Sequence, residues 1–233
     1  MLDKTVSSYD AAVAGVPDGA TILVGGFGAS AVPTELLQAL LRQGARDLTI
    51  VNNNAGNGPL GLSELIAAGR VSRVICSYAR SSNPVEPNQV AFAEAWRAGT
   101  VALECVPQGT MSERMRAAGA GLGPFFTPTG YGTRLGEGKE ARVIEGRGYV
   151  LEQPLPGDFA FVRAHKADRW GNLVYRNADR CFGPIMCMAA KVAVAQVDEV
   201  VPLGALAPDN IHTCGIFVQR IVRMAPAQMG DAS

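Results

Sequence analysis

The chain has 233 residues, of which 48% are hydrophobic and 18% charged, and its 21 basic and 21 acidic side chains cancel. This composition excludes a disordered chain, and the balanced charge excludes the basic stripe that nucleic-acid binding needs. No apolar run approaches the roughly 20 residues that cross a bilayer. We expect a single domain over residues 1–233, with an ordered core from about residue 3 to residue 224.

The cysteines and histidines bear on the compartment and on metal binding. Five cysteines without a C-x-x-C pair favour reduced thiols in a cytoplasm. His165 and His212 are too few and too far apart in the sequence to predict a metal site. The first ten residues lack a basic segment followed by an apolar one, so we expect no signal peptide.

The first half of the chain alternates between strand and helix patterns. A helix over residues 3–15 is expected first, beginning near Asp3 or Thr5. Strands then fit residues 21–24, 48–51, 71–76 and 101–106, and helices fit residues 33–43, 61–69, 89–98 and 110–118. Such alternation is typical of βαβ units, so the fold class is α/β, with an open, mainly parallel sheet flanked by helices.

The pattern changes after residue 120. Residues 121–133 are rich in Gly, Pro, Thr and aromatics and predict a long ordered loop or lid. Later elements are short strands near 141–151, 158–165 and 172–176 as a meander, a helix over 184–190, and strands at 192–197 and 216–222. The segment 81–89 is predicted to be an exposed connection, and the tail from residue 225 to be frayed.

A glycine-rich segment follows the first predicted strand. Gly25, Gly26 and Gly28 let the backbone turn sharply and approach a ligand without an intervening Cβ. Pro33 fits the first position of the next helix, where a missing N–H is harmless, whereas Val32 is a poor N-cap. The free N–H groups of that helix start would suit a carboxylate, an oxyanion or a phosphate.

Other functions are compatible with this glycine segment. Residues 26–31 also fit the G-x-G-x-x-A pattern of dinucleotide-binding proteins. That pattern needs an acid at the end of the second strand, but the strand is followed by three asparagines and Asp47 lies at its other end. A nucleotide-dependent oxidoreductase is therefore disfavoured. A non-catalytic module that binds a small phosphorylated effector and an ordinary tight turn remain alternatives.

Amide side chains follow two of the predicted strands. The sequence NNNAGNG at 52–58 follows the second strand, and Gln108 follows the fourth. Ligands of open α/β sheets lie beyond the carboxyl ends of the strands, so these amides should face one cleft. A neutral amide N–H can stabilise a developing oxyanion without losing a proton, which makes Gln108 a candidate. From the residues alone, an ordinary polar residue at a strand end is the simpler interpretation of Gln108, and an Asx-turn is that of the asparagines. Thr110 and Glu113 have the spacing of a capping box, which predicts a helix beginning just after Gly109.

The segment DGATILVGGFGASAVP at 18–33 resembles a signature of coenzyme A transferases. That signature is Asp-Gly, two variable residues, three apolar residues, Gly-Gly-Phe, three variable residues, Gly, one variable residue and Pro. Ala31 departs from it, because the family usually has Gly there. Cys181 is a second departure, where relatives usually have Asn. The blocks NNAG, PQGT, TPTGYGT, GDFAFVRAHKADRWGNLVYR, FGPIMCMAAK and GIFVQR extend the resemblance over residues 3 to about 224.

The chain is thus similar to the A subunits of the 3-oxoacid type of this family. The resemblance implies an enzyme that uses a coenzyme A thioester as substrate and no tightly bound cofactor. A glutamate of the B subunit attacks the thioester and becomes a glutamyl-CoA thioester. This chain lacks the Glu-Asn-Gly or Glu-Ser-Gly motif of that glutamate. A CoA-transferase B subunit is therefore the expected partner, with two copies of each polypeptide, and the glutamates at 35, 64, 104, 113 and 152 are expected to be structural.

The resemblance also implies the site residues. Gln108 would orient the reacting carbonyl, and Asn53 would contact the coenzyme or the acyl group. The other expected substrate-binding residues are Gly25, Gly26, Phe27, Gly28, Asn54 and Gly109. Arg134 and Lys166 are cations near matched blocks and are candidates for binding a distal carboxylate, although a surface charge is the commoner role.

Overall fold

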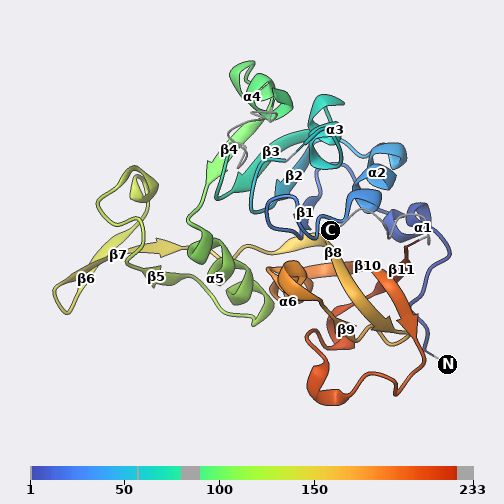
Figure 1. The fold of residues 1–233 in the computed structure, drawn as a ribbon. Coiled ribbons are helices and arrows are strands. Elements are labelled where there is room, and N and C mark those ends of the chain that lie inside the picture. Colours follow the sequence, from blue (N-terminus) through green and yellow to red (C-terminus); the bar gives the residue numbers. More distant parts are fainter. Residues whose placement is uncertain (1, 57, 80–89, 225–233) are drawn as a thin grey trace.

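The computed structural model describes residues 2–56, 58–79 and 90–224. Figure 1 shows a large sheet with helices on both faces and a smaller sheet that projects from it. The predictions made for segment 81–89 and for the tail from residue 225 lie outside the described residues. None of the described helices is long and apolar enough to cross a membrane.

The first half of the main sheet follows the predicted alternation. Its strands are β1 (Thr21–Val24), β2 (Leu48–Val51), β3 (Val71–Cys76) and β4 (Ala102–Cys105), with α2 (Thr34–Gln43), α3 (Leu62–Ala67) and α4 (Val90–Arg97) between them. All neighbouring pairs in this half are parallel. The predicted fold class and the first three predicted strands are confirmed.

The second half of the chain adds strands on the other side of β1. These are β8 (Gly157–Asp168), β10 (Ala190–Val201) and β11 (Arg220–Arg223), with α6 (Gly183–Ala189) between β8 and β10. Within the described residues the sheet has eight strands, in the order β11-β10-β8-β1-β2-β3-β4, and β9 (Leu173–Val174) pairs with β8. The predicted meander is wrong here, because β8 is covered on both faces and runs parallel to β1; only β9 folds back.

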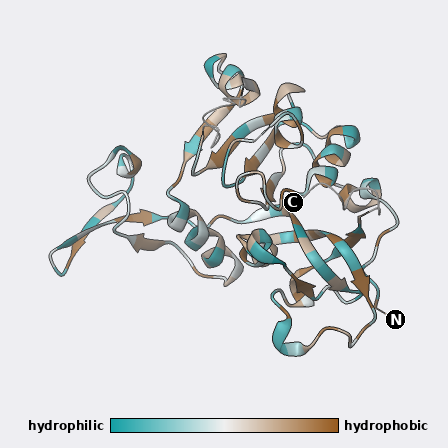
Figure 2. Ribbon diagram, viewed as in Figure 1, coloured by the Kyte–Doolittle hydropathy of each residue, from teal (hydrophilic) through white to brown (hydrophobic). Residues whose placement is uncertain are grey.

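Two apolar layers enclose this sheet, and alternate strand residues belong to different layers. Ile22 and Ile50 pack with the apolar residues of α1 (Tyr9–Val13) and of α2 to α4, whereas Leu23 and Val51 pack with those of α5 (Gln108–Gly119) and α6. Figure 2 shows the brown, hydrophobic strands in the interior and teal residues on the outer sides of the helices. The period of two along each strand therefore places one side chain in each layer.

Helix α5 (Gln108–Gly119) leads into the small sheet, which we call the arm. The arm comprises β5 (Phe125–Thr127), β6 (Ala141–Ile144) and β7 (Arg147–Glu152), in the order β5-β7-β6. The predicted loop at 121–133 thus contains a strand, and the predicted strand at 141–151 is a hairpin. Glu145 and Gly146 both have positive φ (51° and 78°), as a two-residue hairpin turn requires.

The N-terminal helix is shorter than predicted. Helix α1 covers only Tyr9–Val13, and the Ser8 hydroxyl caps it by accepting from the Ala11 N–H. The residues before it run beside β11 instead. Val6 N–H donates to the Ile221 carbonyl, and Ile221 N–H donates to the Lys4 carbonyl, each at 2.8 Å. Pairing with an edge strand has replaced the local preference for a helix.

The strand order creates a switch point at β1. Beyond β1 the chain builds outward through β2, β3 and β4, and it later returns to place β8 on the opposite side of β1. In open α/β sheets the crevice outside the carboxyl ends of the strands at such a point is where ligands bind. The turn after Val24 lies there.

Candidate active site

The glycine loop, residues 25–31, follows β1 directly. Phe27 and Ser30 exchange two backbone hydrogen bonds of 3.0 and 3.1 Å around a turn in which Gly28 has φ of 62°. A Cβ on Gly26 would lie 2.9 Å from Val32 Cγ2, and one on Gly25 would lie 3.3 Å from the Phe161 carbonyl oxygen. Gly26, whose φ is 110°, is thus required by the backbone and its packing, and Gly25 is in tight contact with β8.

Both departures from the family signature meet this loop. Ala31 and Cys181 have positive φ angles of 57° and 25°, which residues other than glycine adopt only rarely. The Cys181 sulfur lies 3.9 Å from the Gly26 carbonyl oxygen, within reach of a weak hydrogen bond. Burial raises the pKa of the Cys181 thiol. Backbone strain is therefore present at one non-glycine residue of the loop, Ala31, and at Cys181, which lies against the loop.

Helix α2 begins one residue later than predicted. Pro33 is the N-cap rather than the first helical residue, and Leu37 N–H donates to its carbonyl at 3.1 Å. Proline has no side-chain acceptor, so among the described residues no side chain caps this helix. The suggestion that an anion binds at this helix start stays a prediction.

The three asparagines after β2 are buried, with 4%, 3% and 5% of their surfaces exposed in chain order. Asn52 Nδ2 donates to the carbonyl oxygens of Val24 (2.7 Å) and Gly25 (3.2 Å), and its Oδ1 accepts from Asn54 N–H (3.0 Å). Asn52 therefore joins the end of β2 to the start of the glycine loop. The sequence pattern did not single out this residue, because its bonds depend on the pairing of β1 with β2.

Gln108 is the first residue of α5, and its side chain meets Asn53. Its Nε2 donates to Asn53 Oδ1 at 2.7 Å, across 55 positions of the chain. The structure thus brings together the two predicted site residues. Gly109 is exposed, and a Cβ added there would meet nothing within 4 Å.

The predicted capping box at the start of α5 is wrong. The helix begins at Gln108 rather than after Gly109, and its N-cap is Pro107. Glu113 pairs with Arg116 instead of reaching back to the helix start. Thr110 is buried, and its hydroxyl has no hydrogen-bond partner within the described part of the chain. A proline cap fixed the helix start two residues before the one the local pattern suggested.

A small cavity lies between the glycine loop, the asparagines and the start of α2. Its volume is about 80 Å³. Its walls are mostly aliphatic, with a hydroxyl and two amides among them. The lining residues are Val24, Ala29, Val32, Thr34, Asn52, Asn54, Gly56, Leu60 and Leu62. We call this cavity the side pocket.

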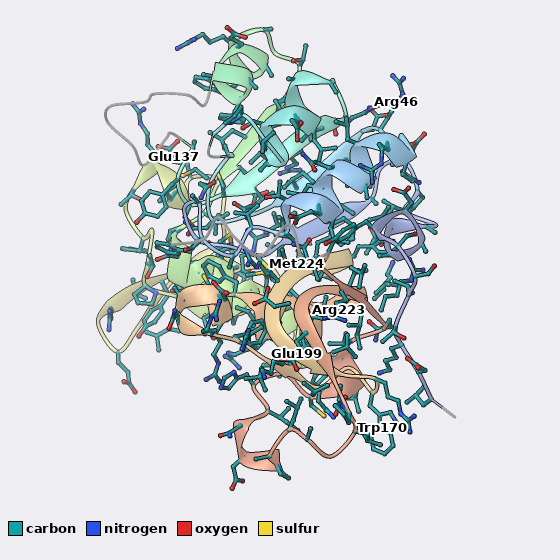
Figure 3. All side chains as sticks on the ribbon, turned by 45° about the vertical axis from the view of Figure 1, so that its right-hand side comes forward. Arg46, Glu137, Trp170, Glu199, Arg223 and Met224 are labelled. Atoms are coloured by element: carbon teal, nitrogen blue, oxygen red, sulfur yellow. The ribbon has the colours of Figure 1, made fainter. Side chains whose placement is uncertain are left out.

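The two candidate cations lie elsewhere. Lys166 pairs with Glu199 at 2.8 Å on the outer part of β8 and β10, where Figure 3 labels Glu199 near Arg223. Arg134 starts a short 3₁₀ turn on the arm. Neither lines the side pocket or contacts the Gln108–Asn53 pair in the described structure.

The glutamates of this chain are engaged in its own structure. Glu35 bonds Gln196, and Glu64 accepts from the Gly61 N–H. Glu104, Glu113 and Glu152 each pair with arginine or lysine. Among the described residues, no group of three or more His, Cys, Asp or Glu side chains has the arrangement of a metal site. The described site is therefore one of neutral amides and backbone groups.

Comparison with known proteins assigns the family. Residues 6–224 match the family model described as coenzyme A transferase. The chain belongs to the coenzyme A transferase family. It is 58% identical over 227 residues to the A subunit of 3-oxoadipate CoA-transferase from Pseudomonas putida, covering 97% of this chain and 96% of that protein. This coenzyme A transferase is also 40% identical to the A subunit of succinyl-CoA:3-ketoacid coenzyme A transferase from Helicobacter pylori, over 95% of this chain and 93% of that one.

A solved structure shares the fold of this family member. Glutaconate coenzyme A-transferase from Acidaminococcus fermentans superimposes with a TM-score of 0.83 at 20% identity, over 94% of this chain and 75% of that chain. At this identity the likeness concerns the fold alone. Both sequence relatives are named as the A subunits of their enzymes, which implies a second subunit for chains of this kind.

Proposed function

We propose that this chain is the non-nucleophilic subunit of a two-component enzyme that moves coenzyme A from succinyl-CoA to 3-oxoadipate. The observation that carries the proposal is the Gln108–Asn53 amide pair beside the glycine loop, at the switch point of a coenzyme A transferase fold. The identity of 58% to the A subunit of a 3-oxoadipate CoA-transferase supports the choice of substrates.

Gln108 is proposed to stabilise the oxyanion of the reacting carbonyl. The Gln108 Nε2 carries two N–H groups, and Asn53 Oδ1 accepts a hydrogen bond from one of them. The other N–H is available for a substrate oxygen. Because Asn53 is buried and accepts from Gln108, it fixes which end of the Gln108 amide faces the substrate. A positioned neutral donor of this kind stabilises charge only as it develops.

The glycine loop, Asn54 and Gly109 are proposed to complete the substrate-binding surface. Gly25, Gly26 and Gly28 shape the turn, and Phe27 is 47% exposed on its outside. The open space around Gly109 at the start of α5 leaves room for the thioester or for the partner polypeptide. Asn52 holds the loop against β2 while these contacts are made.

The nucleophile is proposed to come from the partner. A glutamate carboxylate of the partner attacks the succinyl thioester, which releases the coenzyme A thiolate and forms a mixed anhydride. The thiolate then attacks the glutamyl carbonyl and succinate leaves. The acceptor carboxylate attacks the resulting glutamyl thioester, and the released thiolate attacks the acceptor acyl carbonyl, which regenerates the glutamate. Each step exchanges one acyl bond for another, so the thioester is conserved.

Acetoacetate or acetate is the alternative acceptor, and the Helicobacter pylori relative supports a 3-ketoacid of this kind. A non-catalytic effector-binding module is the alternative from another class of function.

We further propose an assembly of two copies of each polypeptide, acting in the breakdown of aromatic compounds through 3-oxoadipate. A cytoplasmic location is supported by five cysteines that form no disulfide, all of them among the described residues.

The test is an activity measurement on the purified chain with and without its partner. We expect the chain alone to be inactive, and the complex to form 3-oxoadipyl-CoA from succinyl-CoA faster than it forms acetoacetyl-CoA. A complex that prefers acetoacetate would replace the proposed acceptor by the alternative. A chain that transfers coenzyme A without a partner would contradict the division of roles. Tight binding of a sugar phosphate by an inactive complex would support the effector-binding module.

A further inference from the structure

Two cysteines lie opposite each other on the neighbouring strands β3 and β4, which Figure 1 shows side by side. Cys76 ends β3, Cys105 ends β4, and the parallel register makes them direct partners. They share one face of the sheet, because Leu103, two residues before Cys105, packs with the same apolar layer as Cys76. Neighbouring strands are about 4.8 Å apart, which lies within the range of about 4.4–6.8 Å between the Cα atoms of a disulfide.

The two thiols differ in their access to solvent. Cys105 is exposed, whereas Cys76 has 0% of its surface exposed. The Cys105 sulfur lies 3.9 Å from the carbonyl oxygen of Ser77, the residue after Cys76, so it lies on the β3 side of its strand. Burial, and to a smaller extent the charge of a Cys105 thiolate, raises the pKa of Cys76 to about 12. A dissolved oxidant therefore meets Cys105 first, while Cys76 remains a protonated thiol beside it.

A disulfide at this position would draw the two strands together. The side chains of partnered residues run side by side, so their Cβ atoms are separated by about the strand spacing of 4.8 Å. The mean Cβ separation in disulfides is about 3.8 Å, and a bond that departs from this geometry is more easily reduced. In the described structure β4 is the last strand of the main sheet, so a shift of about 1 Å pushes against no further strand. The expected bond is thus strained and reversible, as regulatory disulfides are.

Both cysteines lie just before the candidate site in the chain. The Asn53 carbonyl accepts from the N–H of Ser77, which follows Cys76, at 3.2 Å. On the other strand, Gln108 comes three residues after Cys105, and its Nε2 donates to Asn53 at 2.7 Å. A movement of β4 toward β3 would therefore shift Gln108 relative to Asn53. A misplacement of about 1 Å in an active site can cost about 100-fold in rate.

We propose that Cys76 and Cys105 form a reversible oxidation site for peroxides, which switches off the neighbouring amide pair. The Cys105 sulfur, having released its proton, attacks hydrogen peroxide and breaks the O–O bond, and the displaced hydroxide takes up that proton and leaves as water. The Cys76 sulfur then attacks the resulting sulfenic sulfur, the S–O bond breaks, and the hydroxide leaves with the Cys76 proton as a second water molecule. Two thiols are oxidised to one disulfide, and one peroxide is reduced to water.

Oxidation of the assembled complex tests this site. The complex is treated with a small excess of hydrogen peroxide, the remaining thiols are alkylated, and the tryptic peptides are mapped by mass spectrometry. We expect peptide 74–80, which contains Cys76, to be linked to peptide 98–114, which contains Cys105. Transferase turnover should fall about tenfold or more in proportion to the linked fraction, and dithiothreitol should reverse both changes.

Two serine variants make the result specific. Cys105→Ser keeps an exposed polar side chain of similar size and removes the attacking sulfur. Its turnover should match that of the wild type before peroxide is added and should not fall afterwards. Cys214→Ser is the matched control, because Cys214 is also exposed but lies in the segment before β11. Its linkage and its loss of turnover should equal those of the wild type.

The outcomes separate this inference from the proposed function, on which only the effect on turnover rests. Oxidation that leaves peptides 74–80 and 98–114 unlinked would overturn the oxidation site. Linked peptides with unchanged turnover would overturn its role as a switch, and so would a Cys105→Ser complex that peroxide inactivates as fully as the wild type. A reduced complex without transferase activity would overturn the proposed function, whereas the linked peptides would still form on oxidation.

Discussion

Helix α5 belongs to two polar clusters that are built differently. At its first residue, Gln108 joins the neutral amides of the candidate site through Asn53. Further along the helix, Arg114 joins charged groups at the base of the arm. It bonds Glu104 at 2.7 Å and lies 3.9 Å from Glu152, which also pairs with Lys139 at 2.5 Å. One helix thus carries both the proposed oxyanion donor and the anchor of the arm.

The difference in chemistry indicates a different role for each cluster. Paired charges bind each other strongly and make the arm base stiff, because an unpaired buried charge is costly. Neutral amides hold one another with single bonds and retain further N–H groups, which a substrate can use. We therefore expect changes in the amide cluster to affect catalysis, and changes in the ionic cluster to affect stability.

Gln108→Glu should have the largest effect. The substitution keeps the shape of the side chain but replaces the donor with a carboxylate oxygen that faces Asn53 Oδ1. We expect formation of the glutamyl-CoA thioester to slow by about 100-fold or more, the usual cost of losing one oxyanion donor. Single-turnover kinetics with succinyl-CoA measure this rate. The thermal midpoint should fall by a few degrees, because Asn53 loses its donor, and it is measured to show that the variant is folded at the assay temperature.

Gln153→Glu is the matched control, because Gln153 is exposed and only its backbone carbonyl is bonded to Arg114. In the Gln153→Glu variant, the rate of glutamyl-CoA thioester formation should stay within twofold of the wild-type rate. A Gln108→Glu complex that is as fast as this control would contradict the role of Gln108.

Arg114→Met should lower the free energy of unfolding by about 3 kcal/mol. Breaking a buried ion pair costs about 3–5 kcal/mol, and Arg73 and Lys139 remain to compensate Glu104 and Glu152 in part. Urea unfolding measures the change. The turnover of the folded complex at low temperature should stay close to that of the wild type.

Arg116→Met provides the comparison, because the Arg116–Glu113 pair is about half exposed on the same helix. Exposed pairs contribute roughly 0–1 kcal/mol. Equal stability losses in the two arginine variants would show that the arm base is not a buried ionic anchor.

The local sequence pattern predicted the strands whose apolar, β-branched residues and flanking turn residues are adjacent in the chain. The strands at Thr21–Val24 and Leu48–Val51 are short apolar, β-branched runs that end at glycine or asparagine. Strand β5 was missed, because three residues among glycines and prolines carry no period, and their pairing partner lies beyond residue 149. The start of α5 was misplaced, because the Thr110–Glu113 spacing matched a cap that Pro107 pre-empted.

The site was predicted in its members but not in its contacts. Strand positions placed Asn53 and Gln108 at one edge of the parallel sheet, but it was the family resemblance that singled them out from other polar residues at strand ends. Their mutual bond spans 55 positions, and no local pattern encodes it. Asn52 was missed because its acceptors are backbone carbonyls, which have the same chemistry at every residue and are selected only by strand register.

Cys181→Gly should stabilise the chain by about 1 kcal/mol. The present φ of 25° and ψ of −120° lie outside the regions that L-residues favour, which costs about 1–3 kcal/mol, while glycine loses about 0.5–1 kcal/mol in entropy. Thermal unfolding measures the difference. Cys214→Gly should have the opposite sign, because Cys214 has an ordinary φ of −68°. Destabilisation of similar size in both variants would refute the strain beside the glycine loop.

Lowering the pH should weaken the ionic cluster around Arg114 and leave the neutral amide cluster unchanged. We expect this to be the smallest of the predicted effects. Burial alone raises the pKa of Glu104, but the hydrogen bond and charge of Arg114, with those of Arg73, outweigh it and hold that pKa below its ordinary value of 4.5. A lowered pKa contributes stability that is complete above the unfolded value and is lost as the pH falls through the folded value.

The stability of the wild type should therefore fall below about pH 4.5 more steeply than that of Arg114→Met. Thermal midpoints measured from neutral pH down to the range in which Glu104 is protonated compare the two slopes. Parallel curves would show that Arg114 does not set the pKa of Glu104.

The most direct test of the division of roles is to locate the covalent intermediate. The complex of this chain with its partner is incubated with succinyl-CoA, the thioester is trapped with borohydride, and the modified residue is mapped by mass spectrometry. We predict modification of a glutamate on the partner polypeptide, with the chain of 233 residues left unmodified. An adduct on a glutamate of this chain would contradict the account, since the nucleophile would then belong to the polypeptide to which we assign only the amide half of the site.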